Sequence, residues 1–401
     1  MKNPHLIRRR SGFSLVELMV AVVIGLLALL FATRLVINGE SNKDAAVGGS
    51  DSMQNGMLAM FQLSGDASSA GWGLNDPLVA GCNTTFSDGN GYQLLTAQRD
   101  TTSITPLASV VIQSNGAEPD VISFNSGNDN AAIGSIPLYG PYAGEGYVSS
   151  SQTKPYGYND GDVLVLGTIA GDRPCTLVQI AGPNPANGNQ LLIGGTGYRY
   201  NPQASMAQSY DPKVTYMYNL GRGDLLHFHT WSVSNGVLLL RATELSGAEG
   251  AGVSVVDNVV SIKAQYGFDT RAIAGYDPNP PNNGKDLIAT SNGMQVTQWS
   301  ASMIDADGDG VVGGMGDYQR IAAVRIAVVA RSKTAEKPGV SGACTATKDQ
   351  PQVFTTNVPN TVTAVPMTLD VAVTGDTVDW KCYHYRTFET IVPILNSQYR
   401  P

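Results

Sequence analysis

The sequence predicts an α+β protein in which a long N-terminal helix packs on an antiparallel, β-rich globular domain with long loop insertions. Two observations predict the helix: an apolar run over residues 13–33, and apolar side chains at helical spacing between Met53 and Ala67. A third observation predicts the sheets. From residue 74 onwards, short runs of β-branched and aromatic residues are separated by Gly, Asn, Asp and Pro.

The composition excludes one class of protein. The 401 residues carry 25 Lys plus Arg against 33 Asp plus Glu, which gives a formal net charge of −8. Because phosphate binding needs clustered positive charge, we expect no direct nucleic-acid partner. Hydrophobic residues make up 42% of the chain, which is enough to build a substantial folded core.

The apolar run over residues 13–33 is long enough to cross a membrane. A helix of this length spans ~31 Å, close to the ~30 Å hydrocarbon thickness of a bilayer. Lys2, Arg8, Arg9 and Arg10 precede the run, so the first residues are expected to be cytoplasmic and the rest of the chain exported. A secretory signal peptide has a shorter apolar region of ~7–15 residues, which leaves an uncleaved anchor as the simplest alternative.

Glu17 lies inside this apolar run, and a plain anchor does not explain it. A carboxylate near the centre of a membrane helix costs ~2.5–3.5 kcal/mol on insertion scales. The basic leader followed by Gly12-Phe13-Ser14-Leu15-Val16-Glu17-Leu18 resembles the type IV prepilin motif. The resemblance implies that a prepilin peptidase cuts between Gly12 and Phe13 and methylates the new N-terminus. Glu17 would then neutralise the α-amino group of Phe13 on a neighbouring subunit, because two charges that are each costly alone become tolerable as a pair.

These features divide the chain into four parts. They are a cleaved prepilin leader, a transmembrane and filament-core helix, an amphipathic continuation of that helix, and a periplasmic or extracellular β-rich domain. Their predicted boundaries are 1–12, 13–37, 38–73 and 74–401, respectively.

The helix is expected to be interrupted before its amphipathic part. Gly39 and the Gly48-Gly49 pair each weaken a helix by ~1 kcal/mol relative to Ala, which predicts a bend or a melted stretch. Four large apolar side chains then share one helical face, which we expect to pack on a sheet. They are Met53, Met57, Met60 and Phe61. The segment Ala70-Gly71-Trp72-Gly73 is predicted to end the helix.

Five segments are predicted as strands and three as surface loops. The strands are 110–113, 121–124, 162–166, 225–233 and 237–241. The run 162–166 is largely apolar, so both of its faces are expected to be buried. Asn235-Gly236 between the last two strands predicts a hairpin. The loops, rich in Gly, Asn, Pro and Ser, are 125–160, 182–212 and 270–294.

Further blocks, taken in their order along the chain, resemble the PilW family of minor pilins. They are Gln54-Asn55-Gly56, Gly65-Asp66, Ala70-Gly71-Trp72-Gly73, Val256-Asp257-Asn258-Val259, and the segments 265–270, 320–332 and 385–396. The segment 321–330 is also predicted to be a central strand, in which Arg325 lies near an edge or pairs with a carboxylate.

The resemblance implies a type IV pilus minor pilin that takes part in initiating pilus assembly. The implied partners are prepilin peptidase, other minor pilins and the major pilin, the inner-membrane assembly platform and a large tip adhesin. The implied location is the inner membrane, crossed once with a cytoplasmic N-terminus and a periplasmic C-terminal domain, and then the pilus or cell surface. Two alternatives stay open: a pseudopilin of a type II secretion system, and a pilus-tip adhesin or ligand-binding module.

The segment Asp305-Ala306-Asp307-Gly308-Asp309-Gly310 is typical of a calcium loop. Ca²⁺ binds several oxygens, and alternating carboxylates with Gly at the sixth position can wrap such an ion. The expected ligands are the side chains of Asp305, Asp307 and Asp309, the carbonyl of Val311, and Asp317 as a closing carboxylate. Gly316 stands where an EF-hand has its Glu, which excludes an EF-hand. The alternative to a calcium loop is a solvated acidic turn.

Four cysteines in an exported chain favour disulfides over metal ligation. They are Cys82, Cys175, Cys344 and Cys382, and none forms a C-x-x-C pair. Three pairings are possible, and proximity in sequence favours Cys82 with Cys175 and Cys344 with Cys382.

His227 and His229 lie two residues apart on a predicted strand and therefore project from the same face. Such a pair could chelate a transition metal, but the sequence offers no recognisable third ligand, and two ordinary strand histidines are the simpler interpretation. The chain also contains no G-x-S-x-G, H-E-x-x-H or Walker motif, so we expect no enzymatic activity.

Overall fold

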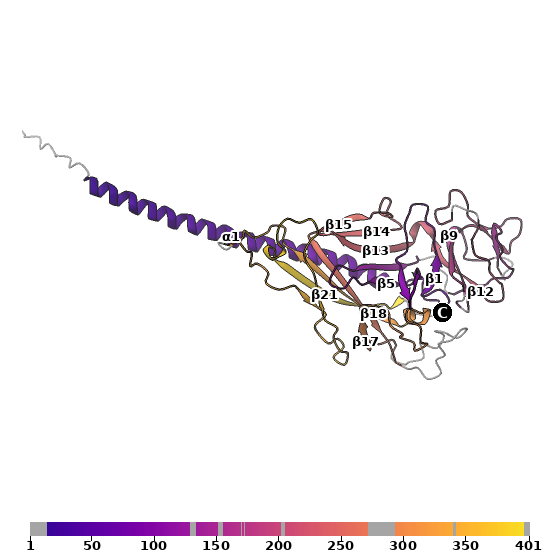
Figure 1. Ribbon diagram of the computed structural model, residues 1–401. Coiled ribbons are helices and arrows are strands. Elements are labelled where there is room, and N and C mark those ends of the chain that lie inside the picture. The colour runs from indigo at the N-terminus through magenta and orange to yellow at the C-terminus, as the bar shows by residue number, and fades with distance from the viewer. Residues whose placement is uncertain are drawn as a thin grey trace, which may run out of the picture.

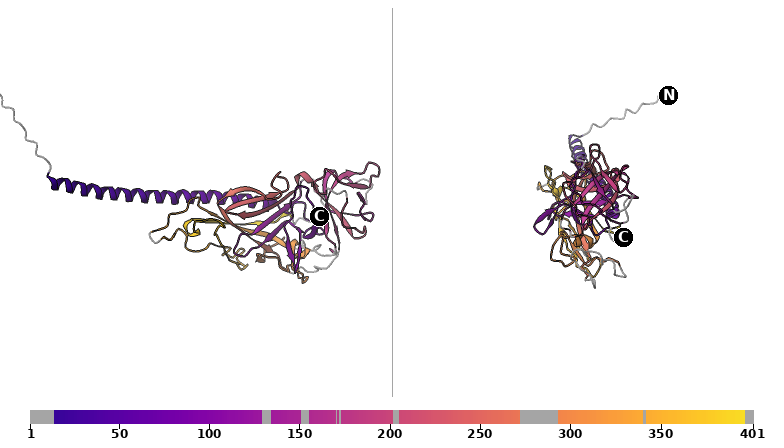
Figure 2. Two further views of the ribbon diagram at one scale, coloured as in Figure 1. Left: turned by 45° about the horizontal axis from the view of Figure 1, so that its top comes forward. Right: turned by 90° about the vertical axis from the view of Figure 1, so that its right-hand side faces the viewer.

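The computed structural model describes residues 14–128, 134–150, 155–169, 171, 173–201, 205–271, 293–339 and 342–396. In this part of the chain, a long N-terminal helix projects from a β-rich domain of mostly antiparallel sheets (Figure 1). A second view shows the same projection (Figure 2). The predicted α+β class is confirmed.

The helix α1 runs from Leu15 to Ser69 without a break. The predicted interruption at Gly39 and Gly48-Gly49 is therefore wrong. Gly48 is buried, and a Cβ at this position would lie 2.9 Å from the Cβ of Ser332. This glycine permits close approach between the helix and the domain, and tertiary packing offsets its low helix propensity.

The second half of α1 buries a face of small side chains. This face consists of Ser52, Gly56, Ala59, Leu63 and Ala67. The predicted packing face is wrong for three of its four residues, because Met53, Met57 and Phe61 are 52%, 53% and 72% exposed, whereas Met60 is partly buried and packs against the core. Small residues form the contact because they let the helix lie close to its neighbouring strands.

Two sheets lie on either side of this half of α1 and share one hydrophobic core with it (Figure 1). The first has the order β15 (Val253–Asp257), β14 (Val237–Ala242), β13 (His227–Ser234), β6 (Val121–Ser126) and β5 (Val110–Gln113). The second has the order β17 (Gln298–Ser300), β16 (Val259–Phe268), β18 (Ile321–Arg331) and β21 (Tyr385–Pro393).

Several sequence predictions fall in these two sheets and are confirmed. Strands β13 and β14 form the predicted hairpin, and Asn235 and Gly236 have φ of 51° and 76°, as a two-residue hairpin turn of type I′ requires. Strand β18 is central, paired with both β16 and β21. Arg325 pairs with Glu389 at 2.9 Å, which settles how its charge is buried.

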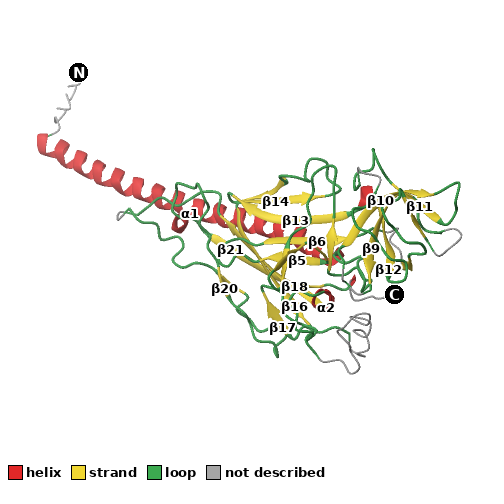
Figure 3. Cartoon of the chain, turned by 45° about the vertical axis from the view of Figure 1, so that its right-hand side comes forward, coloured by secondary structure: helices red, strands yellow, loops and turns green. Residues whose placement is uncertain are grey.

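A third sheet forms the end of the domain farthest from the N-terminus (Figure 3). Its main path is β4 (Pro106–Leu107), β1 (Cys82–Thr85), β10 (Cys175–Pro183), β9 (Asp160–Thr168), β12 (Thr215–Arg222) and β7 (Ile136–Pro137). Strand β11 (Gln190–Ile193) pairs with β10 and with β8 (Tyr147–Ser149). Side chains of β9 alternate between two separate hydrophobic clusters, so both faces of this strand are buried as predicted.

The remaining elements are short. They are β2 (Ala97–Arg99), β3 (Thr102–Ile104), η1 (Gly223–Leu225), α2 (Met315–Gln319), β19 (Gln352–Val353), β20 (Met367–Thr368) and η2 (Trp380–Cys382). The segments 125–160 and 182–212, predicted as loops, contain β7, β8 and β11 as well. Most of the third predicted loop, 270–294, lies outside the described residues.

Both predicted disulfides are present. Cys82 on β1 pairs with Cys175 on β10, and Cys344 pairs with Cys382 at the end of η2. Proximity in sequence therefore selected the correct pairing among the three.

Candidate functional site

The first half of α1 is an exposed apolar rod. Residues Leu15–Val36 form the one helix within the described ranges that is long and apolar enough to cross a membrane, and none of it is buried against the domain. Glu17 lies in its first turn, where one carboxylate oxygen accepts a hydrogen bond from the Ser14 N–H at 3.3 Å. Gly12 and Phe13, the predicted processing residues, lie outside the described residues.

The acidic loop is organised around Asp317 of α2, whose side chain is fully buried. One of its oxygens accepts the N–H groups of Ala306 and Asp307, at 2.5 and 3.3 Å. The other accepts those of Gly313 and Gly314, at 2.7 and 3.0 Å. Burial, with the nearby charge of Asp307 adding to it, raises the pKa of Asp317 to about 7 despite these hydrogen bonds.

Three of the five predicted calcium ligands meet in this loop. Asp305, Asp307 and Asp317 each place one carboxylate oxygen within 4.8 Å of the others. Asp309 is not a member of this group of three, and one of its oxygens accepts the N–H of Val311 at 2.7 Å. Clustered carboxylate oxygens are the ligands that Ca²⁺ prefers, so Asp305 and Asp307 with the buried Asp317 could hold such an ion.

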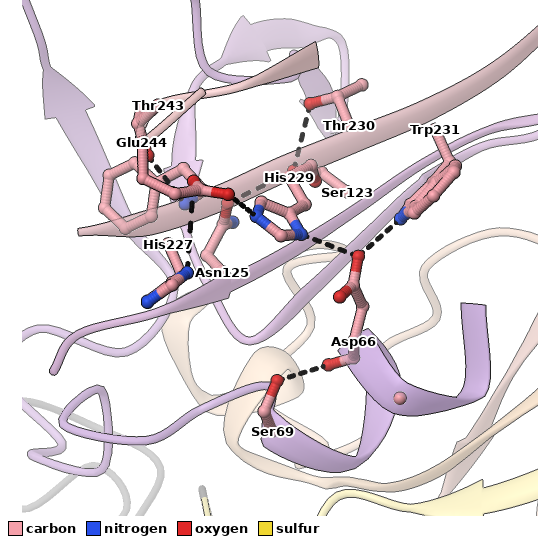
Figure 4. A network of polar contacts seen from close by, with 12 residues as sticks. Asp66, Ser69, Ser123, Asn125, His227, His229, Thr230, Trp231, Thr243 and Glu244 are labelled. Atoms are coloured by element: carbon pink, nitrogen blue, oxygen red, sulfur yellow. Dashed lines mark hydrogen bonds and ion pairs between the residues drawn. The ribbon is translucent and has the colours of Figure 1, made fainter. Parts of the chain in front are cut away.

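A pocket of about 700 Å³ lies where α1 ends against the five-stranded sheet. Asp66, Trp72, His227, His229, Glu244 and Asn396 are among its lining residues. His227, His229 and Trp231 alternate along β13, so their side chains share the face that is turned towards α1 (Figure 4).

His229 is held between two carboxylates in this pocket (Figure 4). Its Nδ1 lies 2.7 Å from Oδ2 of Asp66, and its Nε2 lies 2.7 Å from Oε1 of Glu244. Burial alone would lower the pKa of His229, but the two hydrogen bonds raise it to about 9. Ionised carboxylates only accept hydrogen bonds, so His229 carries a proton on both ring nitrogens in this arrangement.

Two further contacts complete the network. The Trp231 indole N–H donates to the same oxygen of Asp66, at 2.6 Å. His227, whose side chain is 47% exposed, places Nδ1 3.9 Å from Oε2 of Glu244. These charged and polar side chains connect the last turns of α1 to the β13–β14 hairpin and to Glu244 just after it.

The sequence analysis identified the two histidines but missed Glu244 and Asp66. The hairpin register could have found Glu244, because Ser234 faces Val237 and the same register places residue 244 opposite His227. Asp66 has no comparable signal, since only the packing of α1 on the sheet brings it to β13.

Two family models match the chain. The model described as type IV pilus-assembly protein W matches residues 230–396, and the prokaryotic N-terminal methylation motif matches residues 7–33. Over these two segments the chain matches a PilW-family protein and a type IV pilin-like N-terminus. No curated protein and no solved structure shows significant similarity to it.

The two matches cover different structural parts of the chain. The N-terminal match contains Gly12, Phe13 and Glu17, together with most of the exposed apolar helix. The PilW match begins within β13 and contains the β14 strand, the four-stranded sheet and the acidic loop. The third sheet lies outside both matches, and so do the blocks between residues 54 and 73.

Proposed function

We propose that this PilW-family protein is a minor pilin that takes part in initiating pilus assembly. The observation that carries the proposal is the contrast between the two halves of α1. The second half buries one face against the domain, whereas residues Leu15–Val36 expose an apolar surface over their full length. Such a surface requires a bilayer or the helices of other subunits to cover it.

Glu17 supplies the specific contact in this proposal. Within the described residues, its carboxylate accepts a local hydrogen bond from the Ser14 N–H, and its side chain is exposed on the apolar rod. Cleavage between Gly12 and Phe13 would free an α-amino group at Phe13. A neighbouring subunit's Phe13 amine and the Glu17 carboxylate would then pair within an apolar filament core, where each charge alone is costly.

The remaining parts of the proposal follow from this processing. Prepilin peptidase, other minor pilins, the major pilin and the inner-membrane assembly platform are the proposed partners, and a large tip adhesin is a further one. The N-terminus is cytoplasmic before cleavage, and the globular domain is periplasmic and later part of the pilus. The proposed role is assembly rather than catalysis.

The experiment that tests processing is mass spectrometry of the mature N-terminus. We expect the parent chain to begin at methylated Phe13 and Gly12→Ala to leave an uncleaved precursor. Gly25→Ala is the matched control, because a Cβ at Gly25 meets nothing within 4 Å and lies away from the cleavage site. A parent chain that begins at Met1, or normal cleavage of Gly12→Ala, would overturn the processing step.

Pilus number in a deletion strain tests the assembly role. Complementation with the parent should restore pili, whereas Glu17→Leu should not. Ser14→Ala removes the helix cap but keeps the Glu17 charge, so it separates a capping role from a pairing role once its processing has been verified. Full assembly with Glu17→Leu contradicts the proposal.

The same deletion strain separates the two alternative functions. Loss of pili with intact protein secretion argues against a type II pseudopilin, and normal pilus number with lost adhesion would favour a tip adhesin.

A further inference from the structure

The pocket at the end of α1 contains a set of metal-ligand side chains that the assembly role does not use. We propose that His227, His229 and Glu244 form a binding site for a divalent transition metal ion, with Zn²⁺ as the matching ion. Two imidazoles and one carboxylate are a ligand set that catalytic zinc sites use, with a fourth position left for water. Calcium and magnesium prefer oxygen ligands alone, so the nitrogen donors distinguish this pocket from the acidic loop.

The three side chains already lie close to the required geometry. One ligand atom from each lies within 4.8 Å of the others. Tetrahedral zinc with bonds of about 2.1 Å places its ligand atoms about 3.4 Å apart. His229 Nε2 lies 2.7 Å from Oε1 of Glu244, and His227 Nδ1 lies 3.9 Å from Oε2. To reach about 3.4 Å, the first distance must lengthen and the second must shorten, each by less than about 1 Å, which side-chain rotation can supply.

Glu244 provides an independent observation that points to a ligand. Its Oε2 atom is buried and makes no hydrogen bond among the described residues. His227 Nδ1 lies 3.9 Å from it, too far for a hydrogen bond. A buried carboxylate oxygen without a partner is unfavourable, and a metal ion between Glu244 and His227 would satisfy it.

Asp66 is the positioning residue for this site. Histidines that bind metals almost always donate their other ring N–H to a carboxylate or carbonyl, which fixes the tautomer. Asp66 accepts such a bond from His229 Nδ1 at 2.7 Å, and the Trp231 indole holds the same oxygen at 2.6 Å. With Nδ1 committed to Asp66, deprotonated Nε2 would face the metal.

Charge and access also fit a dication. Two carboxylates, Asp66 and Glu244, lie 2.7 Å from the ring nitrogens of His229, and a dication bound there would balance both of their charges. The exposed side of His227 and the pocket of about 700 Å³ leave a path for the ion and room for a water ligand.

The proposal is tested by titrating the full mature chain in detergent, first stripped with EDTA, with Zn²⁺ in a calorimeter. We expect one equivalent to bind, and His227→Gln to weaken binding at least tenfold. Because His227 is half exposed and its side chain makes no close hydrogen bond, with Glu244 3.9 Å away and the centroid of the His229 ring 5.8 Å away, this variant should keep the metal-free melting temperature of the parent. His384→Gln is the matched control, since His384 pairs with Glu336 at 2.7 Å but belongs to no group of three metal-ligand side chains in the described part of the chain. Its zinc affinity should equal that of the parent.

Two further readouts separate a built site from other zinc binding. Co²⁺ should give the visible absorption of a tetrahedral nitrogen-ligated ion, and His227→Gln should abolish it while Asp307→Asn in the acidic loop should not. Asp66→Asn should weaken zinc binding by about 10–100-fold, as loss of an orienting carboxylate does elsewhere. Absence of stoichiometric zinc binding by the parent, or equal binding by His227→Gln, overturns the proposal and leaves His229 as a protonated bridge only.

Discussion

Gly56 of α1 lies directly beneath the ring of Phe388 on β21. A Cβ at Gly56 would lie 2.0 Å from Cε2 of that ring, far inside van der Waals contact. The glycine therefore sets how closely the helix approaches the four-stranded sheet. Leu63 and Ala67 continue the same buried face towards the C-terminal end of the helix.

Replacement of Gly56 by Val should lower the free energy of unfolding. Overpacking of a close contact costs ~1–3 kcal/mol, which exceeds the few tenths of a kcal/mol that Val gains over Gly in helix propensity. Thermal unfolding followed by circular dichroism measures the change. Gly65→Val is the matched control, because Gly65 is exposed and a Cβ there meets nothing within 4 Å. Equal melting temperatures for the two variants would contradict the assigned contact.

The sequence predicted the fold class better than it predicted how the helix docks. Apolar residues at helical spacing indicate that a face of the helix is covered, but they do not show whether the domain or another molecule covers it. Met53, Met57 and Phe61 face away from the domain, while the contact with the sheets uses residues as small as Gly56. Gly48, one of the glycines that predicted a broken helix, is instead a position of close approach. Its role depends on Ser332, which lies more than 250 residues away in the chain.

The candidate site was half predictable for a similar reason. Strand periodicity placed His227 and His229 on one face, and the hairpin turn was recognised from Asn235-Gly236. The register of that hairpin, extended past its last paired residues, also places Glu244 opposite His227. Asp66 enters only through tertiary packing, so no local pattern could have included it. The acidic loop, by contrast, is local, and Asp305, Asp307 and Asp317 lie together in it, whereas Asp309, which was also expected as a ligand, is not in that group.

Lys263 is a second position where burial predicts that a substitution strongly lowers the free energy of unfolding. Its side chain and that of Asp120 are both fully buried and form an ion pair. The ammonium group also donates to the carbonyls of Gly116 and Glu118, at 2.8 and 3.0 Å, so it ties the loop before β6 to β16. Lys263→Met removes these bonds and leaves a buried carboxylate unpaired, which should cost about 3–5 kcal/mol of unfolding free energy.

Denaturant unfolding of Lys263→Met, Asp120→Asn, their double variant and one control variant tests this assignment. Lys333→Met is the control, since Lys333 is exposed and its replacement should change stability by less than about 0.5 kcal/mol. Lys263→Met combined with Asp120→Asn removes both charges and should lose less stability than Lys263→Met alone. A double variant that is as unstable as the sum of the single ones would show that the two side chains do not interact.

Calcium should stabilise the chain through the acidic loop. With a dissociation constant of 10⁻⁴–10⁻³ M, the range of extracellular sites, 10 mM Ca²⁺ should add about 1.4–2.7 kcal/mol and raise the melting temperature by a few degrees. Asp307→Asn should abolish that rise while leaving the calcium-free melting temperature nearly unchanged. Asp349→Asn, which changes an exposed acid elsewhere, should retain the full rise.

Asp317→Asn should instead lower the melting temperature with or without calcium, because the Asp317 carboxylate accepts four backbone N–H groups that an amide cannot all satisfy. If millimolar Ca²⁺ leaves the parent's melting temperature unchanged, the loop is a solvated acidic turn closed by Asp317 alone.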